Sequence, residues 1–180
     1  MHYKDFHESV LYWARIRGFD ESDPRSQYLS CVEESVKEIS ESKMNLDDAM
    51  LSDAIGDTAV TLIILDLQLK KKNYISRSEA GILFTGDYTE LMYRIGCIGA
   101  SLRREKWDQA ALDVSLALAC LIEFCNKEGM YFDECCGHAW DEIKDRVGMM
   151  INGSYVKESD LNCLQRLEFD KRIVDARFPD

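Results

Sequence analysis

Two short segments place acidic residues four positions apart. Glu34 and Glu38 have this spacing in the first segment, and Asp53 and Asp57 have it in the second. Side chains four residues apart leave the same face of a helix, where like charges repel one another. Clustered carboxylates that face a core need a partner, and hard divalent cations are their natural partner. The spacing therefore predicts a Mg2+ site made by these four acids, with Glu33 as an additional ligand.

A solvated helix face is the alternative interpretation of the first segment, because Lys37 continues its charged pattern. Asp53 has a similar alternative, as a surface acid in the first turns of its helix. Asp57 is different, because a long apolar run surrounds it. Gly56 beside it would let a second helix approach closely. The acids predict a metal site most firmly at Asp57.

Composition limits the class of protein. A length of 180 residues fits one domain, and a hydrophobic content of 46% is sufficient for a core. The net charge of -11 disfavours nucleic-acid polymers and anionic membranes as partners. Neither a leader peptide nor a membrane-spanning run is recognisable, and seven cysteines are an odd number. We expect a cytoplasmic protein with free thiols, in the host cytoplasm if it is phage-encoded.

Apolar periodicity predicts an all-α fold, a bundle of five or six helices. Asn45 is a candidate cap of the third helix, and the lysines at 70–72 would end it. Residues 73–87 are expected to be irregular, and residues 147–180 to form turn or extended chain followed by a short helix or a loose arm. We find no convincing strand pattern. The expected helices are 3–17, 25–41, 47–70, 88–104, 107–127 and 131–146.

The acids should meet because the second and third helices are close in sequence. Only a few residues around 43–45 join them, so they are expected to pack as antiparallel neighbours. Their acidic faces would then supply four or five oxygens to one or two Mg2+ ions. Magnesium bound in this way keeps several waters and commonly bridges to the phosphates of a substrate.

Three blocks of sequence resemble a known family. Residues 27–34 and 53–64 are similar to the two signature blocks of the MazG-like all-α nucleoside triphosphate pyrophosphohydrolases, and Trp13-Ala14-Arg15 fits their first helix. Residues 140–158 resemble the C-terminal block of the phage-type members. The resemblance places a single helical domain at 1–161, with a less typical helical insertion at 73–127 and a C-terminal arm at 162–180.

This resemblance implies a specific activity. The chain would form a homodimer or homotetramer and hydrolyse a (deoxy)nucleoside triphosphate to the monophosphate and pyrophosphate. The reaction would need Mg2+, with Mn2+ as a substitute, and no nucleic-acid polymer or membrane would take part. Lys144 and Arg146 have an alternative interpretation. They could be the basic residues of an exposed helix end, where such residues are favoured in any case. The resemblance implies Glu34 and Glu38 as catalytic residues, Glu33, Glu34, Glu38, Asp53 and Asp57 as metal ligands, and Lys144, Arg146 and Lys157 as phosphate-binding residues.

The acidic spacing differs from the usual family pattern, which has two adjacent glutamates and a third one three residues after the second. Counted from Glu34, that third position is Lys37; a frame moved by one residue recovers Glu38 but places Ser35 in the pair. In the second block Ala54 takes the position of an acid. Two alternatives therefore stand beside the hydrolase: a nucleotide-binding protein without turnover, and a helical module that binds another protein.

Overall fold

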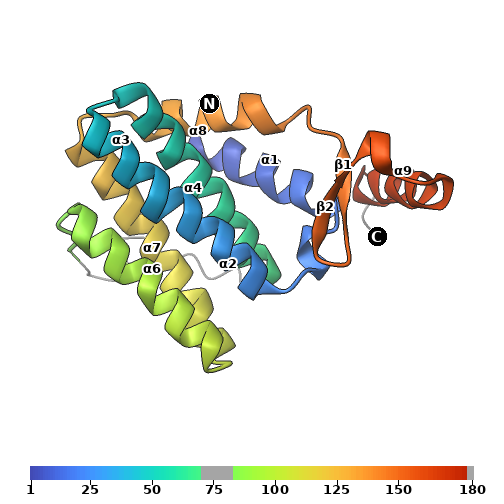
Figure 1. Cartoon of the computed structure of the whole chain (residues 1–180), viewed down its shortest axis with the longest axis horizontal. Coiled ribbons are helices and arrows are strands. Elements are labelled where there is room, and N and C mark those ends of the chain that lie inside the picture. Colours follow the sequence, from blue (N-terminus) through green and yellow to red (C-terminus); the bar gives the residue numbers. More distant parts are fainter. Residues whose placement is uncertain (70–82, 178–180) are drawn as a thin grey trace.

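Helices make up most of the chain in the computed structural model, which describes residues 1–69 and 83–177 (Figure 1). The expected all-α fold is confirmed. The described residues also form a small two-stranded sheet and two short 3-10 turns, at Phe19–Glu21 and Glu158–Asp160. The elements are α1 (Tyr3–Ile16), α2 (Pro24–Val32), the π-helical segment η2 (Glu33–Glu38), α3 (Ile39–Asn45), α4 (Asp48–Gln68), α6 (Tyr88–Arg103), α7 (Trp107–Lys127), α8 (Phe132–Ile143), β1 (Gly148–Ile151), β2 (Ser154–Lys157) and α9 (Cys163–Arg177).

Helix α4 lies at the centre of the bundle. It contacts α1, α2, η2, α3, α7 and α8, while α6 packs on the outer side of α7 (Figure 1). Ile55 and Ile64, nine positions apart and so on opposite sides of α4, are both buried. A helix that is apolar on most sides is buried on most sides, as the sequence predicts for this segment.

The turn before α4 differs from the expected one. Asp47, not Asn45, caps the helix, and its carboxylate accepts a hydrogen bond from the backbone N–H of Met50 at 3.0 Å. Asn45 is the last residue of α3, and Leu46 follows it in the left-handed conformation with a φ of 54°. The connection between α3 and α4 is therefore only two residues long. Such a short loop makes the two helices antiparallel neighbours.

Helices α2, η2 and α3 follow one another without a break. Asp23 caps the start by accepting from the N–H of Arg25 at 2.8 Å, and Pro24 occupies the first position of the helix, where its missing N–H costs nothing. The expected helix over 25–41 is thus longer, and Glu33–Glu38 in its middle are π-helical. A π-helical turn holds one more residue than an α-helical turn, and such turns are frequent at functional sites.

The C-terminal part corrects the expectation that the chain lacks strands. β1 and β2 form an antiparallel hairpin in which Gly148 pairs with Lys157. The turn residues Asn152 and Gly153 both have positive φ, at 50° and 81°, and Asn-Gly is a strong hairpin signal. Helix α9 follows, so of the two expected alternatives, a short helix or a loose arm, the chain forms the helix. Residues 178–180 lie outside the described part.

A small apolar cluster holds the hairpin and α9 together. Met149, Leu161 and Phe169 are buried in it, apart from the main core. The backbone N–H of Met150 donates to the carbonyl of Arg17 at 2.7 Å, which ties β1 to the end of α1. The hairpin and α9 therefore sit at the end of the bundle where α1 stops and α2 begins (Figure 1).

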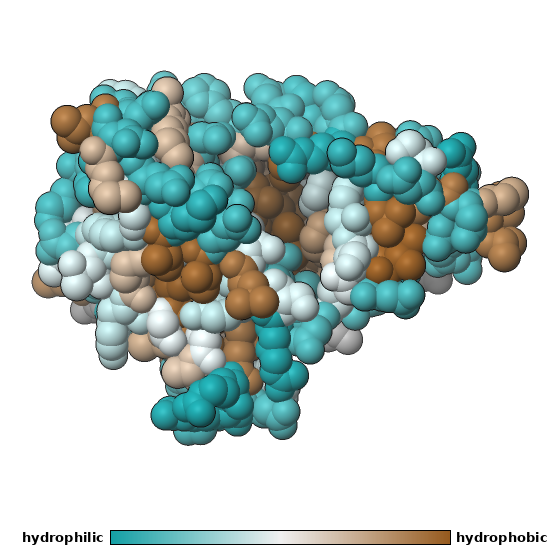
Figure 2. All heavy atoms as spheres, in the orientation of Figure 1, coloured by the Kyte–Doolittle hydropathy of each residue, from teal (hydrophilic) through white to brown (hydrophobic). Residues whose placement is uncertain are grey.

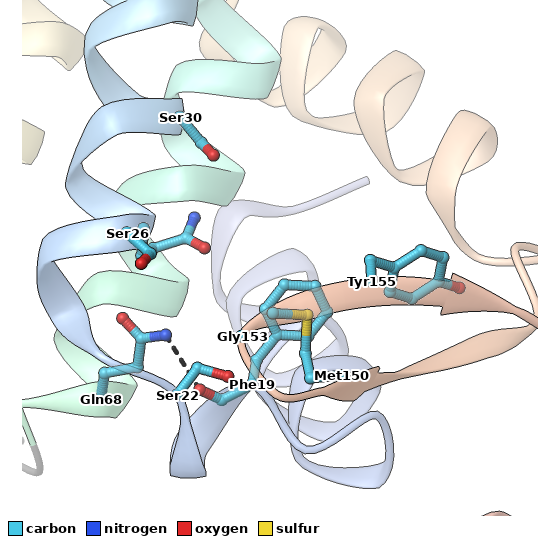
Figure 3. A pocket seen from close by; sticks show the side chains of 9 residues that line it. Phe19, Ser22, Ser26, Ser30, Gln68, Met150, Gly153 and Tyr155 are labelled. Atoms are coloured by element: carbon cyan, nitrogen blue, oxygen red, sulfur yellow. Dashed lines mark hydrogen bonds between the residues drawn. The ribbon is translucent and has the colours of Figure 1, made fainter. Parts of the chain in front are cut away.

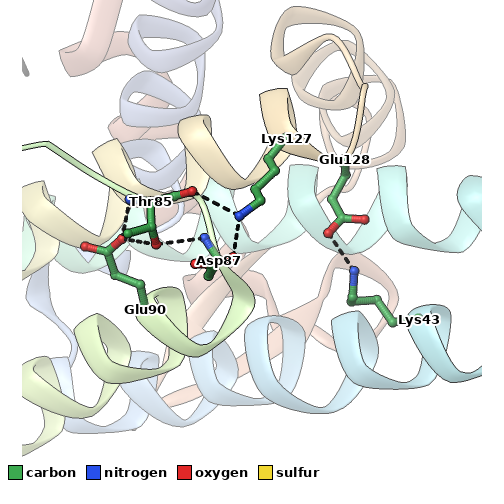
Figure 4. Close-up of polar contacts among 6 residues, drawn as sticks. All are labelled: Lys43, Thr85, Asp87, Glu90, Lys127 and Glu128. Carbon is green, nitrogen blue, oxygen red and sulfur yellow. Dashed lines mark hydrogen bonds and ion pairs between the residues drawn. The ribbon is translucent and has the colours of Figure 1, made fainter.

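Polar contacts hold the start of α6 and the end of α3 against the end of α7 (Figure 4). Glu90 accepts from the backbone N–H of Thr85 at 2.7 Å, and Lys127 pairs with Asp87. Lys43 pairs with Glu128 at 2.5 Å. The described part of the expected insertion, 83–127, is thus a helical hairpin that packs into the main core. Residues 73–82 of the irregular segment expected at 73–87, and the lysines at 70–72, lie outside the described residues.

Apolar side chains are also exposed on one face of the bundle. Figure 2 shows hydrophobic surface over α2 and α6, where Leu29 is 68% exposed and Tyr93 is 65% exposed. Among the helices of the described ranges, none combines the length and the apolar character that a membrane crossing requires. The seven cysteines are free thiols, as the sequence suggests.

The close approach of α4 and α8 predicts the effect of one substitution. A Cβ at Gly56 of α4 would lie 2.4 Å from the carbonyl oxygen of Cys135 and 2.8 Å from the Cβ of Ala139 on α8. Gly56→Ala should therefore lower the free energy of unfolding by about 1–3 kcal/mol, as overpacking does. Urea denaturation followed by circular dichroism would measure the change.

Gly96→Ala is the matched control, because a Cβ at this position of α6 meets nothing within 4 Å. It should raise stability by about 0.5–1 kcal/mol, since alanine restricts the unfolded chain and favours the helix. Equal effects of the two substitutions would contradict the close packing of α4 on α8.

Candidate functional site

The acids of η2 and α4 face one another across the antiparallel pair of helices. The order of contacts fixes the direction: Gln27 of α2 bonds to Thr61 of α4, and η2 packs on α4. The two helices therefore run in opposite directions, and Glu34 lies opposite Asp57. Glu38 and Asp53 follow at the next turn of each helix. All four carboxyl groups are half-buried, and the expected antiparallel arrangement is confirmed.

Glu34 experiences the strongest electrostatic perturbation of these acids. Burial raises its pKa from 4.5 to about 8, and the charges of Asp57, Glu38 and Glu33 add to the shift, as does hydrogen bonding with Glu38. One of its carboxyl oxygens, Oε2, is buried and has no hydrogen-bond partner within the described residues. A buried carboxylate in this position needs a proton or a cation.

Asp57 connects the acids of α4 to the end of α8. Its pKa is raised from 3.8 to about 6, mainly by burial; the charges of Asp53, Glu142 and Glu38 contribute to the rise, and the charge of Arg146 opposes it. Glu142 and Arg146 form an ion pair with 3.7 Å between nitrogen and oxygen. Arg146 is thus a cation whose field reaches Asp57.

Packing between α4 and α8 places these two residues. Ser52 donates to the sulfur of Cys135 at 3.3 Å, and Gly56 one turn later lies against Cys135 and Ala139. The two helices therefore run in the same direction, and the end of α8 arrives at Asp57. A side chain at position 56 would push α8 away, so the glycine permits this approach.

Arg17 fixes the backbone that follows α8. Its Nε donates to the carbonyl of Arg146 at 3.0 Å, and its Nη1 donates to the carbonyl of Trp13 at 3.1 Å. The guanidinium also stacks over the Trp13 ring, 4.4 Å from its centroid. Arg17 is only 4% exposed, so it binds the backbone carbonyl of Arg146 from a position inside the protein. The side chain of Arg146 stays at the surface.

The other residues predicted for the site lie on its edge or away from it. Glu33 is exposed and pairs with Lys37 at 3.8 Å, so it points to solvent rather than to Asp57. Lys144 is exposed and pairs with Asp141 at 2.5 Å, as expected for an ordinary helix end. Lys157 is exposed at the end of β2. Of the three predicted phosphate-binding residues, only Arg146 perturbs an acid of the cluster.

The donor set suits a hard cation, because carboxylate oxygens are the ligands that Mg2+ prefers. The Oε2 atom of Glu34, which is buried without a hydrogen-bond partner among the described residues, is an acceptor that a cation would satisfy. In residues 1–69 and 83–177, however, no three Asp, Glu, His or Cys side chains converge closely enough to hold a metal ion. Mutual repulsion of the acids favours this separation, and a cation would draw them together.

Sequence reasoning missed two titratable groups near α4. The charge of Glu142 on α8 raises the pKa of Asp57. Its position four residues before Arg146 indicates an ion pair on a helix surface. Nothing in the sequence, however, shows that α8 ends beside Asp57. Burial raises the pKa of Asp66 to about 7. This residue lies nine positions beyond Asp57 and acts on Tyr3 of α1, so it belongs to another face of α4.

Comparison of the chain with protein-family models, with curated proteins and with solved structures gives no match.

The raised pKa values predict how stability depends on pH. The folded protein binds a proton at Glu34 up to about pH 8, whereas the unfolded chain releases it near 4.5. Deprotonation between these values therefore favours unfolding, and stability should fall as the pH rises. Glu34→Gln removes this proton, so it should raise the melting temperature at pH 8 without divalent cations and reduce the fall between pH 5 and pH 8.

Glu41→Gln on α3 is the control for the loss of one negative charge, and it should leave the slope unchanged. Differential scanning calorimetry at several pH values measures both. A wild-type melting temperature that rises over this range, or an equal fall in the Glu34→Gln protein, would argue against the buried position of Glu34.

Proposed function

We propose that the chain is a Mg2+-dependent hydrolase that converts a (deoxy)nucleoside triphosphate to the monophosphate and pyrophosphate, in the manner of the MazG-like pyrophosphohydrolases that its sequence resembles. The observation that carries the proposal is the meeting of Glu34 and Asp57 across two antiparallel helices, both with raised pKa values. Acids with strongly perturbed pKa values beside a surface cation are typical of functional sites.

The π-helical segment gives this proposal further support. The sequence differs from the family pattern by one extra position between the second and third glutamates. Glu34 and Glu38 both lie within η2, which begins at Glu33 and ends at Glu38. Because a π-helical turn accommodates one additional residue, the longer spacing brings Glu38 round to the same side as Glu34. Glu33 and Glu34 at the start of the segment would then fit the first frame, and Glu38 at its end the second.

Each residue of the cluster then has a distinct task. Glu34, Glu38, Asp53 and Asp57 would hold Mg2+, and Mn2+ would substitute for it. The bound ion would neutralise phosphate charge and lower the pKa of a water molecule. Arg146 supplies a fixed positive charge beside Asp57, suited to a phosphate oxygen. Its position depends on Arg17, which binds its backbone carbonyl. Glu33, Lys144 and Lys157 have no part in this arrangement.

Assembly of the chain into a homodimer or homotetramer belongs to the same proposal. The exposed apolar residues Leu29 and Val36 lie on α2 and η2, the helix that carries Glu34. A second copy that covered this face would bury them next to the acids. Light scattering of the purified protein would give the oligomeric state.

A nucleotide-binding protein without turnover is the second candidate. Two observations favour it: Lys37 pairs with Glu33 where the family has an acid, and no three acids of the described residues converge on one point. Calorimetry separates the two functions, since the binding protein would give heat with a nucleoside triphosphate and Mg2+ but release no pyrophosphate.

The proposal predicts a specific loss of activity. Incubation with a panel of ribo- and deoxyribonucleoside triphosphates and Mg2+ should give monophosphate and pyrophosphate, separated by ion-exchange chromatography. Asp57→Asn should lower the rate by at least about a hundredfold, because it removes a charged ligand in the centre of the cluster. Mg2+ should also raise the melting temperature of the wild-type protein at pH 8, and less so that of the variant.

Asp170→Asn on the exposed face of α9 is the matched control and should keep full activity. A folded wild-type protein that hydrolyses none of the nucleotides with either Mg2+ or Mn2+ would refute the proposed reaction.

A further inference from the structure

A second candidate site lies along the same pair of helices, at the end away from Glu38. It is a pocket of about 200 Å³ between the start of α2, the end of α4 and the β1–β2 hairpin (Figure 3). Ser26, Gln27 and Ser30 line it from α2, and Gln68 from α4. Met150 and Tyr155 close it from the hairpin. Its size suits one planar heterocycle rather than a whole nucleotide.

Two nearly buried amides decide what the pocket can recognise. Gln27 and Gln68 are each only 7% exposed. Gln68 donates its amide nitrogen to the backbone carbonyl of Phe19 at 2.9 Å (Figure 3), and Gln27 donates to the carbonyl of Thr61 at 3.4 Å. A backbone carbonyl can only accept, so each amide must turn its NH2 group towards it. The amide oxygens remain as acceptors for something else.

The oxygen of Gln68 lacks such a donor. Its Oε1 is buried and has no hydrogen-bond partner within the described residues. A buried acceptor without a donor costs free energy, which a ligand N–H group would recover. The hydroxyls of Ser26 and Ser30 either donate or accept, so they impose no opposite preference. The amides thus make the pocket a site for a ligand that donates.

Aromatic rings form a wall of the pocket. The Phe19 ring contacts two others: Trp13, with centroids 5.4 Å apart and planes at 29°, and Tyr155, with centroids 6.0 Å apart and planes at 24°. These contacts hold Phe19 rigidly beside the amides. A flat apolar surface next to hydrogen-bond acceptors fits a planar nitrogen heterocycle better than a flexible or saturated ligand.

The pocket and the acids lie in one line along the helix. Ser26, Ser30 and Glu34 follow each other at intervals of four residues, so they share a face of α2 and its π-helical continuation. At a rise of about 1.5 Å per residue, Ser26 and Glu34 are about 12 Å apart along the axis. A nucleotide has this extended form, with the base at one end and the phosphates at the other.

We propose that this pocket binds the base of the substrate and selects a nucleobase with an exocyclic amino group, such as cytosine or adenine. The inference rests on the proposed function for the position of the phosphates. The amino group donates to the free amide oxygens, above all to that of Gln68. A base with a keto group at the same position, such as uracil or hypoxanthine, would place two acceptors against each other.

Matched nucleotide pairs test the selection, because each pair exchanges an exocyclic amino group beside an acceptor ring nitrogen for a keto group beside a ring N–H group. The kcat/KM for hydrolysis of CTP should exceed that of UTP by about tenfold, and likewise ATP against ITP, as expected for one hydrogen bond to a buried acceptor. Gln68→Met keeps the length of the side chain but loses the amide, so it should bring both ratios close to one. Gln27→Met tests the second amide, and Gln109→Met on α7, remote from the pocket, should keep the wild-type ratios.

Binding of monophosphates separates this inference from the proposed reaction. Calorimetry with CMP and UMP, and with AMP and IMP, needs neither metal nor turnover. A preference for the amino member that Gln68→Met removes supports the pocket even if no triphosphate is hydrolysed. Equal affinity within both pairs, no binding of any monophosphate, or a preference that survives both glutamine variants would overturn the assignment.

Discussion

The nearly complete burial of α4 is the constraint on which the other elements depend. A helix that is apolar on most sides needs neighbours all round, and α1, α2, α3, α7 and α8 supply them. Any acid on such a helix is brought close to another helix. Asp57 therefore meets the acids of η2 on one side and the end of α8 on the other. The same burial that stabilises the bundle creates the electrostatic stress at the candidate site.

The π-helical segment shows how a helix accommodates an extra residue without losing its core. Cys31 before the segment and Ile39 after it are both completely buried. In a regular α-helix these positions, eight residues apart, would share a broad face. The wider turn at Glu33–Glu38 lets the apolar positions and the acids face α4 together.

Much of the fold follows from the sequence, because helical periodicity is a local property. The helix at 107–127 and the burial of α4 were predictable, as was the meeting of Glu34 with Asp57 through a short loop. The hairpin was missed although Asn152-Gly153 is present, since its strands are only four residues long and too short to show alternation. Glu142 and the glutamine pocket depend on packing between distant segments, which no local pattern records.

The contacts of Arg17 have a consequence for the order in which the chain folds. Arg17 and Arg146 are separated by 129 positions, and Trp13 donates to the carbonyl of Ile143, 130 positions away. During synthesis α1 leaves the ribosome well before α8, because the groups that bind its C-terminal end follow about 130 positions later. The apolar face of α1 can pack on α4 earlier, but the contacts at its C-terminal end must wait for α8. Closing so long a loop makes the docking of α1 with the hairpin a late step of folding.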